Sequence, residues 1–176
     1  MKSLEHEAVF IHFDPGTCKG YLYKSSIADE LANRWFGKYY QDKLVLELVE
    51  VAYLLSTGKV VTGANGKRIQ DLSTLVSEYA HCFEEFFWPM LTVFKDLRER
   101  GRRVRVLEPM KFLVRDKGSE LRLIYVLEEK SLIRINDITE IISEALRNNL
   151  KATLAIVSLH GELTYYEISQ ADLKVD

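Results

Sequence analysis

The segment from Val93 to Gly101 places the strongest constraint on how this chain can fold. Val93, Phe94 and Leu97 fall on one side of a helical projection and charged residues on the other, and Gly101 stands where a helix end favours glycine. After this glycine, Val104 and Val106 alternate with arginines, a period-two pattern that is typical of a strand. The segment therefore predicts an amphipathic helix that leads directly into a sheet.

The rest of the second half continues this sheet. Asp137 and Glu140 form a candidate capping box for a helix over Ile138–Leu150, which carries one apolar stripe. Strand-like runs occur before and after that helix, at Leu121–Leu127, Ala152–Val157 and Leu163–Ile168. The order of three strands, a helix and two strands predicts an α/β (α+β) domain with a mixed sheet flanked by helices.

The first half predicts a smaller mixed α/β domain. Extended runs at Ala8–Phe13 and Gly20–Tyr23 flank the turn signal Asp14-Pro15-Gly16, and a helical stripe covers Leu44–Leu55. Gly63–Lys67 is typical of a loop, and Asp71 of a helix start. We expect an N-terminal domain over residues 1–82 and a C-terminal domain over residues 83–176.

Composition narrows the class of protein. A formal charge of −2 argues against coating nucleic acid by bulk positive charge, so any contact with RNA must be local. Cys18 and Cys82 are far apart and have no metal-binding spacing, which predicts free thiols rather than a disulfide framework or a zinc site. We expect no cofactor. The chain shows neither a signal peptide nor an apolar run of membrane-spanning length, so we expect a cytoplasmic protein.

Three segments resemble one known family. VFKDLRERG (Val93–Gly101) resembles the VYxDLRxRGY signature of the archaeal tRNA-splicing endonucleases, YLLSTGKV resembles their EAxYLLxxGK segment, and Ala155–Ser169 is similar to their AIVD…TYY ending. The resemblance implies a two-domain subunit of an enzyme that cuts bulge-helix-bulge precursor tRNA without metal, leaving a 2′,3′-cyclic phosphate. In that family a Tyr, a His and a Lys act as proton acceptor, proton donor and cation at one phosphate.

The residues that the family uses for this chemistry are missing here. Histidine occurs only at four positions, His6, His12, His81 and His160, none of them in the interval where the family has its general acid. Lys111-Phe112 matches the start of the KFGxDFxVY segment, but no tyrosine follows at the expected place, and Leu150 stands at the lysine position with Lys151 next to it. The resemblance thus implies no catalytic residue and no metal, as in the structural subunit of the α2β2 enzymes of crenarchaea, which pairs with a catalytic subunit.

Candidate RNA contacts come from a basic cluster. Arginine suits phosphate contacts that position an RNA without reading its bases, although cations at a helix end are also favourable in themselves and can simply be solvated. The residues that we expect at the RNA are Arg102, Arg103, Arg105, Lys111 and Lys151.

Candidate assembly contacts lie in two places. The resemblance implies an acidic loop that inserts into a neighbouring subunit, which corresponds here to Glu128 and Glu129, although an ordinary charged turn explains them equally well. The last strand carries Tyr165 and Tyr166 on opposite faces and could pair with a second copy of itself, or pack inside its own sheet.

Two other functions stay open. Asp116 and Glu129, with neighbouring lysines, loosely fit the paired carboxylates of a metal-dependent nuclease of the restriction-enzyme type. The chain could also be a stand-alone RNA-binding or scaffold module that never joins an endonuclease.

Overall fold

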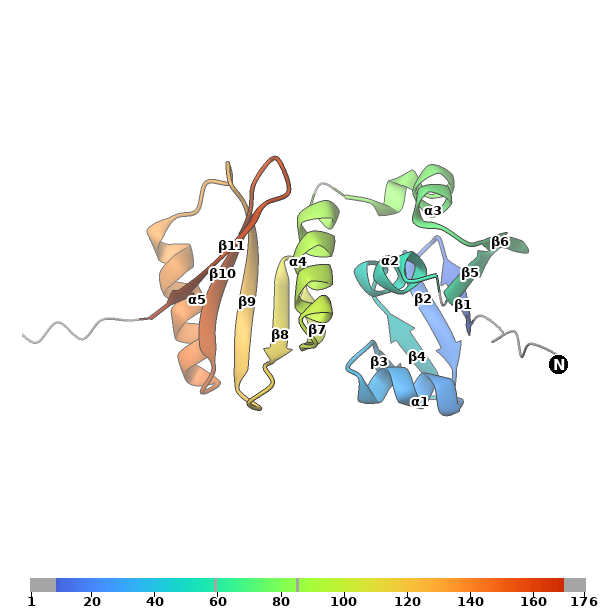
Figure 1. The fold of residues 1–176 in the computed structure, drawn as a ribbon, viewed down its shortest axis with the longest axis horizontal. Coiled ribbons are helices and arrows are strands. Elements are labelled where there is room, and N and C mark those ends of the chain that lie inside the picture. Colours follow the sequence, from blue (N-terminus) through green and yellow to red (C-terminus); the bar gives the residue numbers. More distant parts are fainter. Residues whose placement is uncertain (1–8, 59, 85, 170–176) are drawn as a thin grey trace, which may run out of the picture. The chain divides into compact units, whose positions relative to one another are not determined.

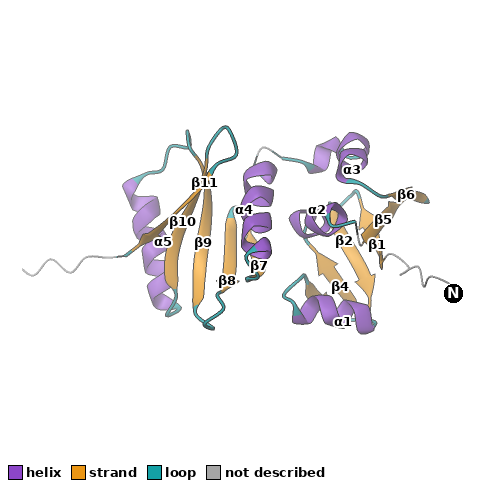
Figure 2. Ribbon diagram, viewed as in Figure 1, coloured by secondary structure: helices purple, strands orange, loops and turns teal. Residues whose placement is uncertain are grey.

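A computed structural model of the protein describes residues 9–58, 60–84 and 86–169. The chain divides into two compact units, Met1–Phe87 and Trp88–Asp176. Each unit combines a mixed sheet with helices, so the predicted α/β class is confirmed (Figures 1 and 2). Within the described ranges, none of the helices combines the length and the apolar character needed to cross a membrane.

The first unit is built on a six-stranded sheet with the order β3-β4-β2-β1-β5-β6. Its strands are β1 (Val9–Asp14), β2 (Lys19–Tyr23), β3 (Lys38–Tyr40), β4 (Lys43–Leu46), β5 (Val60–Ala64) and β6 (Lys67–Ile69). Its helices are α1 (Ser26–Asn33), α2 (Leu48–Ser56), α3 (Leu72–Glu78) and the short 3-10 helix η1 (Ala80–Cys82). β1 pairs with β2 in an antiparallel hairpin, as predicted, and runs parallel to β5.

The predicted helix over Leu44–Leu55 is wrong in its first part. Leu44 and Leu46 alternate inward in β4 and are fully buried, and the helix begins only at Leu48. The two-residue period of a strand and the 3.6-residue period of a helix both fit this apolar run. The sequence pattern alone therefore did not show where the strand ends and the helix begins. The change of direction is fixed by Glu50, whose carboxylate accepts hydrogen bonds from the backbone N–H groups of Gly37 and Glu47, each at 2.8 Å.

The predicted loop at Gly63–Lys67 is shorter than expected. Ala64 pairs with Lys67 in a hairpin, and only Asn65 and Gly66 form the turn, both with positive φ angles (51° and 77°). Asn-Gly is the favoured pair for such a two-residue turn because glycine and asparagine tolerate this conformation. The predicted helix start at Asp71 is confirmed, since its carboxylate accepts a hydrogen bond from the N–H of Thr74.

The prediction of free thiols is also wrong. Cys18, in the turn after β1, forms a disulfide with Cys82 of η1 across 64 residues of sequence, with the two Cα atoms 5.5 Å apart. Only the tertiary fold brings these two segments together, because neither cysteine carries a local spacing signal. The 3-10 segment is therefore covalently tied to the start of the sheet.

The second unit is built on a five-stranded sheet with the order β11-β10-β9-β8-β7. Its strands are β7 (Arg103–Glu108), β8 (Lys111–Arg115), β9 (Leu121–Glu128), β10 (Lys151–Val157) and β11 (Leu163–Ile168). The helices are α4 (Phe87–Glu99) and α5 (Ile135–Arg147). Only β9 and β10 run parallel, joined by the crossover helix α5, and the other neighbours are antiparallel.

Each helix contributes to a separate apolar layer of this sheet. Val93, Phe94 and Leu97 of α4 are fully buried, and the rings of Phe94 and Phe112 (β8) meet edge to face with centroids 5.8 Å apart. Ile141 and Ala145 of α5 pack with a second cluster, Leu123, Ala152 and Leu154. Because side chains alternate along a strand, one sheet supplies both layers.

Helix α5 begins three residues earlier than the predicted Ile138. Asp137 is therefore inside the first turn, where its carboxylate accepts a hydrogen bond from the backbone N–H of Arg134 at 3.1 Å. The hydrogen bond lowers the pKa of Asp137, and this negative charge also suits the N-terminal end of a helix. The predicted capping box with Glu140 is wrong, and Glu140 is exposed.

Candidate functional site

The segment Val93–Gly101, which resembles the family signature, forms the last turns of α4 and its C-terminal cap. The N–H of Gly101 donates to the carbonyl of Arg98 (2.9 Å), and the N–H of Arg102 donates to that of Leu97 (3.0 Å). Together with the φ of +77° at Gly101, these bonds form a Schellman motif. The helix thus stops at a fixed residue, and the chain enters β7 with its arginines in a defined orientation.

The arginines of this cluster are mostly engaged inside the protein. Arg98 donates to the carbonyl of Val104 (2.7 Å), and Arg100 forms an ion pair with Asp96 (3.0 Å). Of the predicted RNA contacts, Arg102 pairs with Asp116 at 2.9 Å, Arg105 is half-buried in β7, and Arg103 is exposed at the start of that strand. Arg103 is therefore the cation of this group that is best placed to meet a phosphate.

Lys111 lies in a polar cluster between β8, β9 and α5. Its Nζ is 3.0 Å from the carboxylate of Glu144 and 3.3 Å from that of Glu108, and it lies 5.2 Å from the ring centre of Tyr125. Burial acts to lower the pKa of Lys111, but its hydrogen bonds to Glu144 and Glu108 raise it overall. The phenol of Tyr125 also donates to Glu144. The lysine side chain is only 12% exposed, so a phosphate would have to displace these carboxylates.

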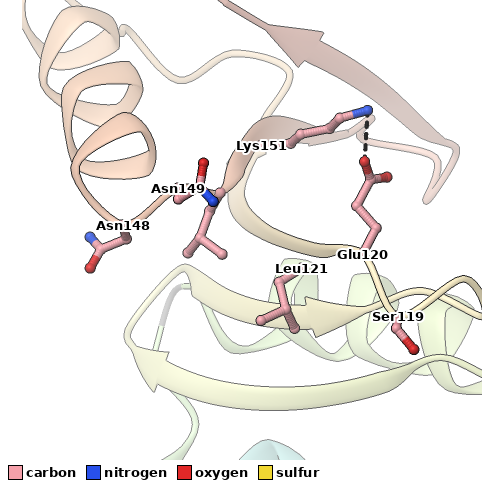
Figure 3. A pocket seen from close by; sticks show the side chains of 7 residues that line it. Ser119, Glu120, Leu121, Asn148, Asn149 and Lys151 are labelled. Carbon is pink, nitrogen blue, oxygen red and sulfur yellow. Dashed lines mark ion pairs between the residues drawn. The ribbon is translucent and has the colours of Figure 1, made fainter.

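A hollow of about 580 Å³ lies at the end of α5, where the chain turns into β10. It is lined by Ser119, Glu120, Leu121, Asn148, Asn149, Leu150 and Lys151 (Figure 3). Lys151 and Glu120 point toward one another, and their charged atoms are 2.9 Å apart. This ion pair lowers the pKa of Glu120 and raises that of Lys151.

The hollow holds a cation and a carboxylate but no group suited to donate a proton at neutral pH. Its lining residues include neither histidine nor tyrosine, and the lowered pKa keeps Glu120 ionised. In the second unit the sequence has one histidine, His160, which follows the far end of β10. Six strand steps at about 3.3 Å per residue put Val157, the last residue of β10 before His160, on the order of 20 Å from Lys151. Acid–base cleavage of a phosphodiester in this hollow would therefore lack its proton donor.

Asp116, a carboxylate of the alternative metal-dependent site, is held by two arginines. Its oxygens lie 2.9 Å from Arg102 and 2.7 Å from Arg122. Among the described residues, the one group of three candidate ligands is Cys18, His81 and Cys82, whose two sulfurs are bonded to each other. Asp116 contacts Arg122 near the start of β9, whereas Glu129 follows the other end of that strand, so the structure does not bring the two together as a pair of metal ligands.

The predicted assembly residues lie at the end of β9 and on β11, two strands that are separated in the sheet by β10. Glu128 ends β9, and Glu129 follows it and accepts a hydrogen bond from the N–H of Leu159 at 3.4 Å. Tyr165 donates to Asp96 of α4 at 2.7 Å, and the guanidinium of Arg100 lies over its ring. Tyr166 is 53% exposed on β11, which pairs only with β10 among the described strands and so forms an edge of the sheet.

The sequence did not predict which carboxylates pair with the cations of this unit, and it indicated Asp116 only as a candidate metal ligand. Glu120 and Asp116 lie in and beside the turn between β8 and β9, and Glu144 lies on α5 four residues before the helix C-cap. A signal existed for Asp116, because an acid directly after the end of one strand lies beside the basic residues at the adjoining ends of its antiparallel neighbours, here Arg102 and Arg122. The partners themselves depended on the register of β8, β9 and β10, which the sequence did not fix.

Comparison with known proteins covers both units. Residues 17–75 match the family model of the tRNA intron endonuclease N-terminal domain, and residues 87–165 match that of the catalytic C-terminal domain. A tRNA-splicing endonuclease of Thermococcus kodakarensis is 34% identical over 140 residues, which cover 77% of this chain and 82% of that protein. One of Pyrococcus horikoshii is 36% identical over 151 residues, covering 77% of this chain and 81% of that protein.

A longer relative carries the same name. A tRNA-splicing endonuclease of Methanosarcina mazei is 31% identical over 157 residues, which cover 86% of this chain but only 44% of that protein. The resemblance predicted from three short segments is therefore confirmed over both halves of the sequence. The chain belongs to the tRNA intron endonuclease family.

Proposed function

We propose that this chain is the structural, non-catalytic subunit of a tRNA-splicing endonuclease, which assembles with a catalytic subunit as α2β2. The observation that carries the proposal is the hollow at the end of α5, where Lys151 is paired with Glu120 and no proton donor is present. Cleavage through the 2′-hydroxyl needs a base, an acid and a cation around one phosphate. This unit lacks part of that set of base, acid and cation. A partner subunit that supplies the missing groups explains best why an endonuclease unit lacks them.

The second unit retains surfaces that suit assembly. The free edge of β11 offers backbone groups to a second strand, and Tyr166 stands exposed beside them. Glu128 and Glu129 form the end of β9 and the start of an exposed turn, from which carboxylates can reach a basic pocket of a partner. We propose both segments as subunit contacts, and we place the assembled enzyme in the cytoplasm.

The second part of the proposal is that this subunit helps to position the bulge-helix-bulge precursor tRNA. Arg103 offers an exposed guanidinium, and Arg105 lies two residues further along the same strand. Arg102, Lys111 and Lys151 are engaged with carboxylates, so RNA phosphates would have to replace Asp116, Glu144 or Glu120 as their partners. Phosphate contacts of this kind set register and orientation rather than sequence preference.

The decisive test is reconstitution. The purified chain is mixed with candidate catalytic subunits, and cleavage of a bulge-helix-bulge RNA is followed in the presence of EDTA. We expect cleavage in the mixture and none by the chain alone, with native mass spectrometry giving a 2:2 assembly. Cleavage by the chain alone would refute the proposal.

Two variants separate assembly from folding. Reversing the charge of Glu128 and Glu129 should weaken co-purification with the catalytic subunit, whereas reversal at the exposed Glu140 is the matched control. If the double reversal leaves the 2:2 mass unchanged, these residues have no part in assembly. Magnesium-dependent cleavage by the chain alone would instead favour the metal-dependent nuclease, which the two arginines at Asp116 argue against.

A further inference from the structure

The six-stranded sheet of the first unit buries one face and leaves the other exposed. Along β1, Ile11 and Phe13 are buried while Phe10 and His12 are exposed, and along β2, Leu22 is buried while Tyr23 is exposed. Alternation along the strands assigns the two sets to opposite faces. None of the described helices covers the exposed set, since Phe10 and Tyr23 retain 43% and 58% of their accessible surface.

Aromatic rings gather on this open face. The rings of Phe10 and His12 meet edge to face with centroids 4.9 Å apart, and those of His12 and Tyr23 do so at 5.8 Å. Tyr40 is 65% exposed on β3 and stands directly opposite Lys43 of β4, the partner of Tyr23 on its other side. The exposed rings thus lie on three of four neighbouring strands, and Lys43 of β4 stands between Tyr23 and Tyr40.

A hollow of about 410 Å³ lies beside the first of these rings. Phe10, His12, Gly63 and Arg68 are among the residues that line it. The ring of Phe10 lies across Gly63, where a Cβ atom would come within 2.3 Å of Phe10 Cζ. A side chain at position 63 would therefore push the ring away, and the glycine keeps both the ring position and the hollow.

The charge of the face is positive. Lys38, Lys43 and Arg68 share it, because their positions pair with Val45, Tyr23 and Gly63 in the sheet. The Nζ atom of Lys43 lies 5.2 Å from the ring centre of Tyr23. Within the described part of the chain, none of these three cations has a carboxylate at ion-pair distance.

Two acids on this side of the sheet already have polar partners. Glu47 pairs with Lys19 at 2.8 Å, and Asp14 accepts hydrogen bonds from the N–H of Gly16 and the hydroxyl of Thr17. Both lie at the end of the sheet that is remote from Phe10 and Tyr23, since Asp14 ends β1 and pairs with Lys19 at the start of β2. Among the described residues, neither acid is therefore paired with the cations beside the rings, Lys38, Lys43 and Arg68.

We propose that this face, the aromatic-basic face of Phe10, His12, Tyr23, Tyr40, Lys38, Lys43 and Arg68, binds an unpaired RNA strand. Bases stack on exposed aromatic rings whatever their sequence, and lysine and arginine meet the phosphates between them. Cations that form no ion pair with the described carboxylates favour a polyanion over a protein partner. The inference deepens the proposed function, on which it rests for its biological setting, by assigning the first unit a role in holding a single-stranded part of the precursor.

The test uses the full chain without a catalytic subunit. A fluorescein-labelled oligouridine of 10 nucleotides and a fully paired RNA hairpin are titrated with the protein, and anisotropy gives the dissociation constants. We expect the oligouridine to bind, Phe10→Ala and Tyr23→Ala each to weaken it about tenfold, and Tyr23→Phe to retain binding. Phe86→Ala is the matched control, because Phe86 is 42% exposed outside the sheet.

Salt dependence tests the role of the cations. For single strands the slope of log K against log salt is about −0.7 per phosphate contact, so Lys43→Gln should make it shallower by about 0.7. Lys95→Gln, on an exposed lysine of α4, should leave the slope unchanged. Thermal unfolding of each variant checks that the fold is kept.

The results of these binding experiments test the aromatic-basic face separately from the reconstitution, which tests the proposed function. Equal binding by the wild type, Phe10→Ala and Tyr23→Ala, or no binding of oligouridine at low salt, overturns the aromatic-basic face as an RNA site. Loss of the 2:2 mass in these variants with unchanged RNA affinity would overturn it in favour of a protein interface. A chain that binds oligouridine here but never activates a catalytic subunit would contradict only the proposed function.

Discussion

The two units of this protein differ in how their basic side chains are paired with carboxylates. In the second unit, Asp116, Glu120 and Glu144 pair with three of the five cations that were predicted to contact RNA, Arg102, Lys151 and Lys111. In the first unit, a covalent cross-link and the buried Glu50 stabilise the fold, while the cations on the aromatic-basic face have no carboxylate partner among the residues that the structure describes. The unit that resembles a catalytic domain thus pairs most of its predicted RNA cations internally and leaves Arg103 exposed, whereas on one face of the smaller unit several cations form no ion pair with the described carboxylates.

The largest expected effect concerns the core of the second unit. Phe112 is fully buried against Phe94, so Phe112→Ala leaves a cavity and should lower the free energy of unfolding by about 4 kcal/mol. Hydrogen-exchange mass spectrometry, read separately for peptides of each unit, measures where protection is lost. Leu159→Ala, at a side chain 63% exposed in the same unit, is the control and should cost less than about 0.5 kcal/mol. Equal loss in both units would show that they unfold together.

The converse experiment destabilises the first unit by removing its disulfide. Replacing Cys18 and Cys82 by serine frees a loop of 64 residues in the unfolded chain, which should destabilise the first unit by about 3 kcal/mol. Hydrogen exchange should then increase between β1 and η1 and stay unchanged in the second unit. A reducing agent should reproduce the change in the wild-type protein and have no effect on the double variant. An unchanged wild type would contradict a stabilising disulfide.

The sequence predicted the second unit better than the first, for a physical reason. Val93, Phe94 and Leu97 mark the buried side of α4, and the strands that follow have apolar alternation, so local patterns were sufficient. In the first unit, Leu44 and Leu46 fitted both a helix and a strand, and the pairing of Cys18 with Cys82 depended on contacts 64 residues apart. Local signals predict elements well, whereas they do not predict which distant elements meet.

At the candidate site, too, local features could be predicted from the sequence and contacts between distant elements could not. The absence of a histidine near Lys151 could be read directly from the sequence, because a missing residue type needs no geometry. The pairing of Lys151 with Glu120, and of Lys111 with Glu144, required the register of β8, β9 and β10 and the position of α5. The aromatic-basic face was not predicted either, since its residues are spread over five strands with no common motif.

A smaller effect is expected at the buried carboxylate of the first unit. Glu50→Gln replaces an acceptor of two backbone N–H groups by an amide whose own N–H₂ faces one of them. Hydrogen bonds to a charged group are worth more than neutral ones, so we expect a loss of about 2 kcal/mol. Denaturant unfolding followed by the fluorescence of Trp35 in this unit, in a Trp88→Phe background, measures it. Glu30→Gln, on an exposed residue of α1, is the control and should be neutral.

The smallest effect is a pH dependence confined to the second unit. The hydrogen bond from Tyr125 and the ion pair with Lys111 lower the pKa of Glu144, so its contribution is present above the unfolded value of 4.5 and is lost as pH falls below it. Glu144→Gln should therefore lower the stability by about 1 kcal/mol at pH 7 and by less at pH 3. At the alkaline end, burial and the hydrogen bond to Glu144 raise the pKa of Tyr125 to about 12, so its contribution disappears between pH 10 and that value. A Glu140→Gln control that shows the same pH dependence would assign the effect to the net charge of α5 instead of to this cluster.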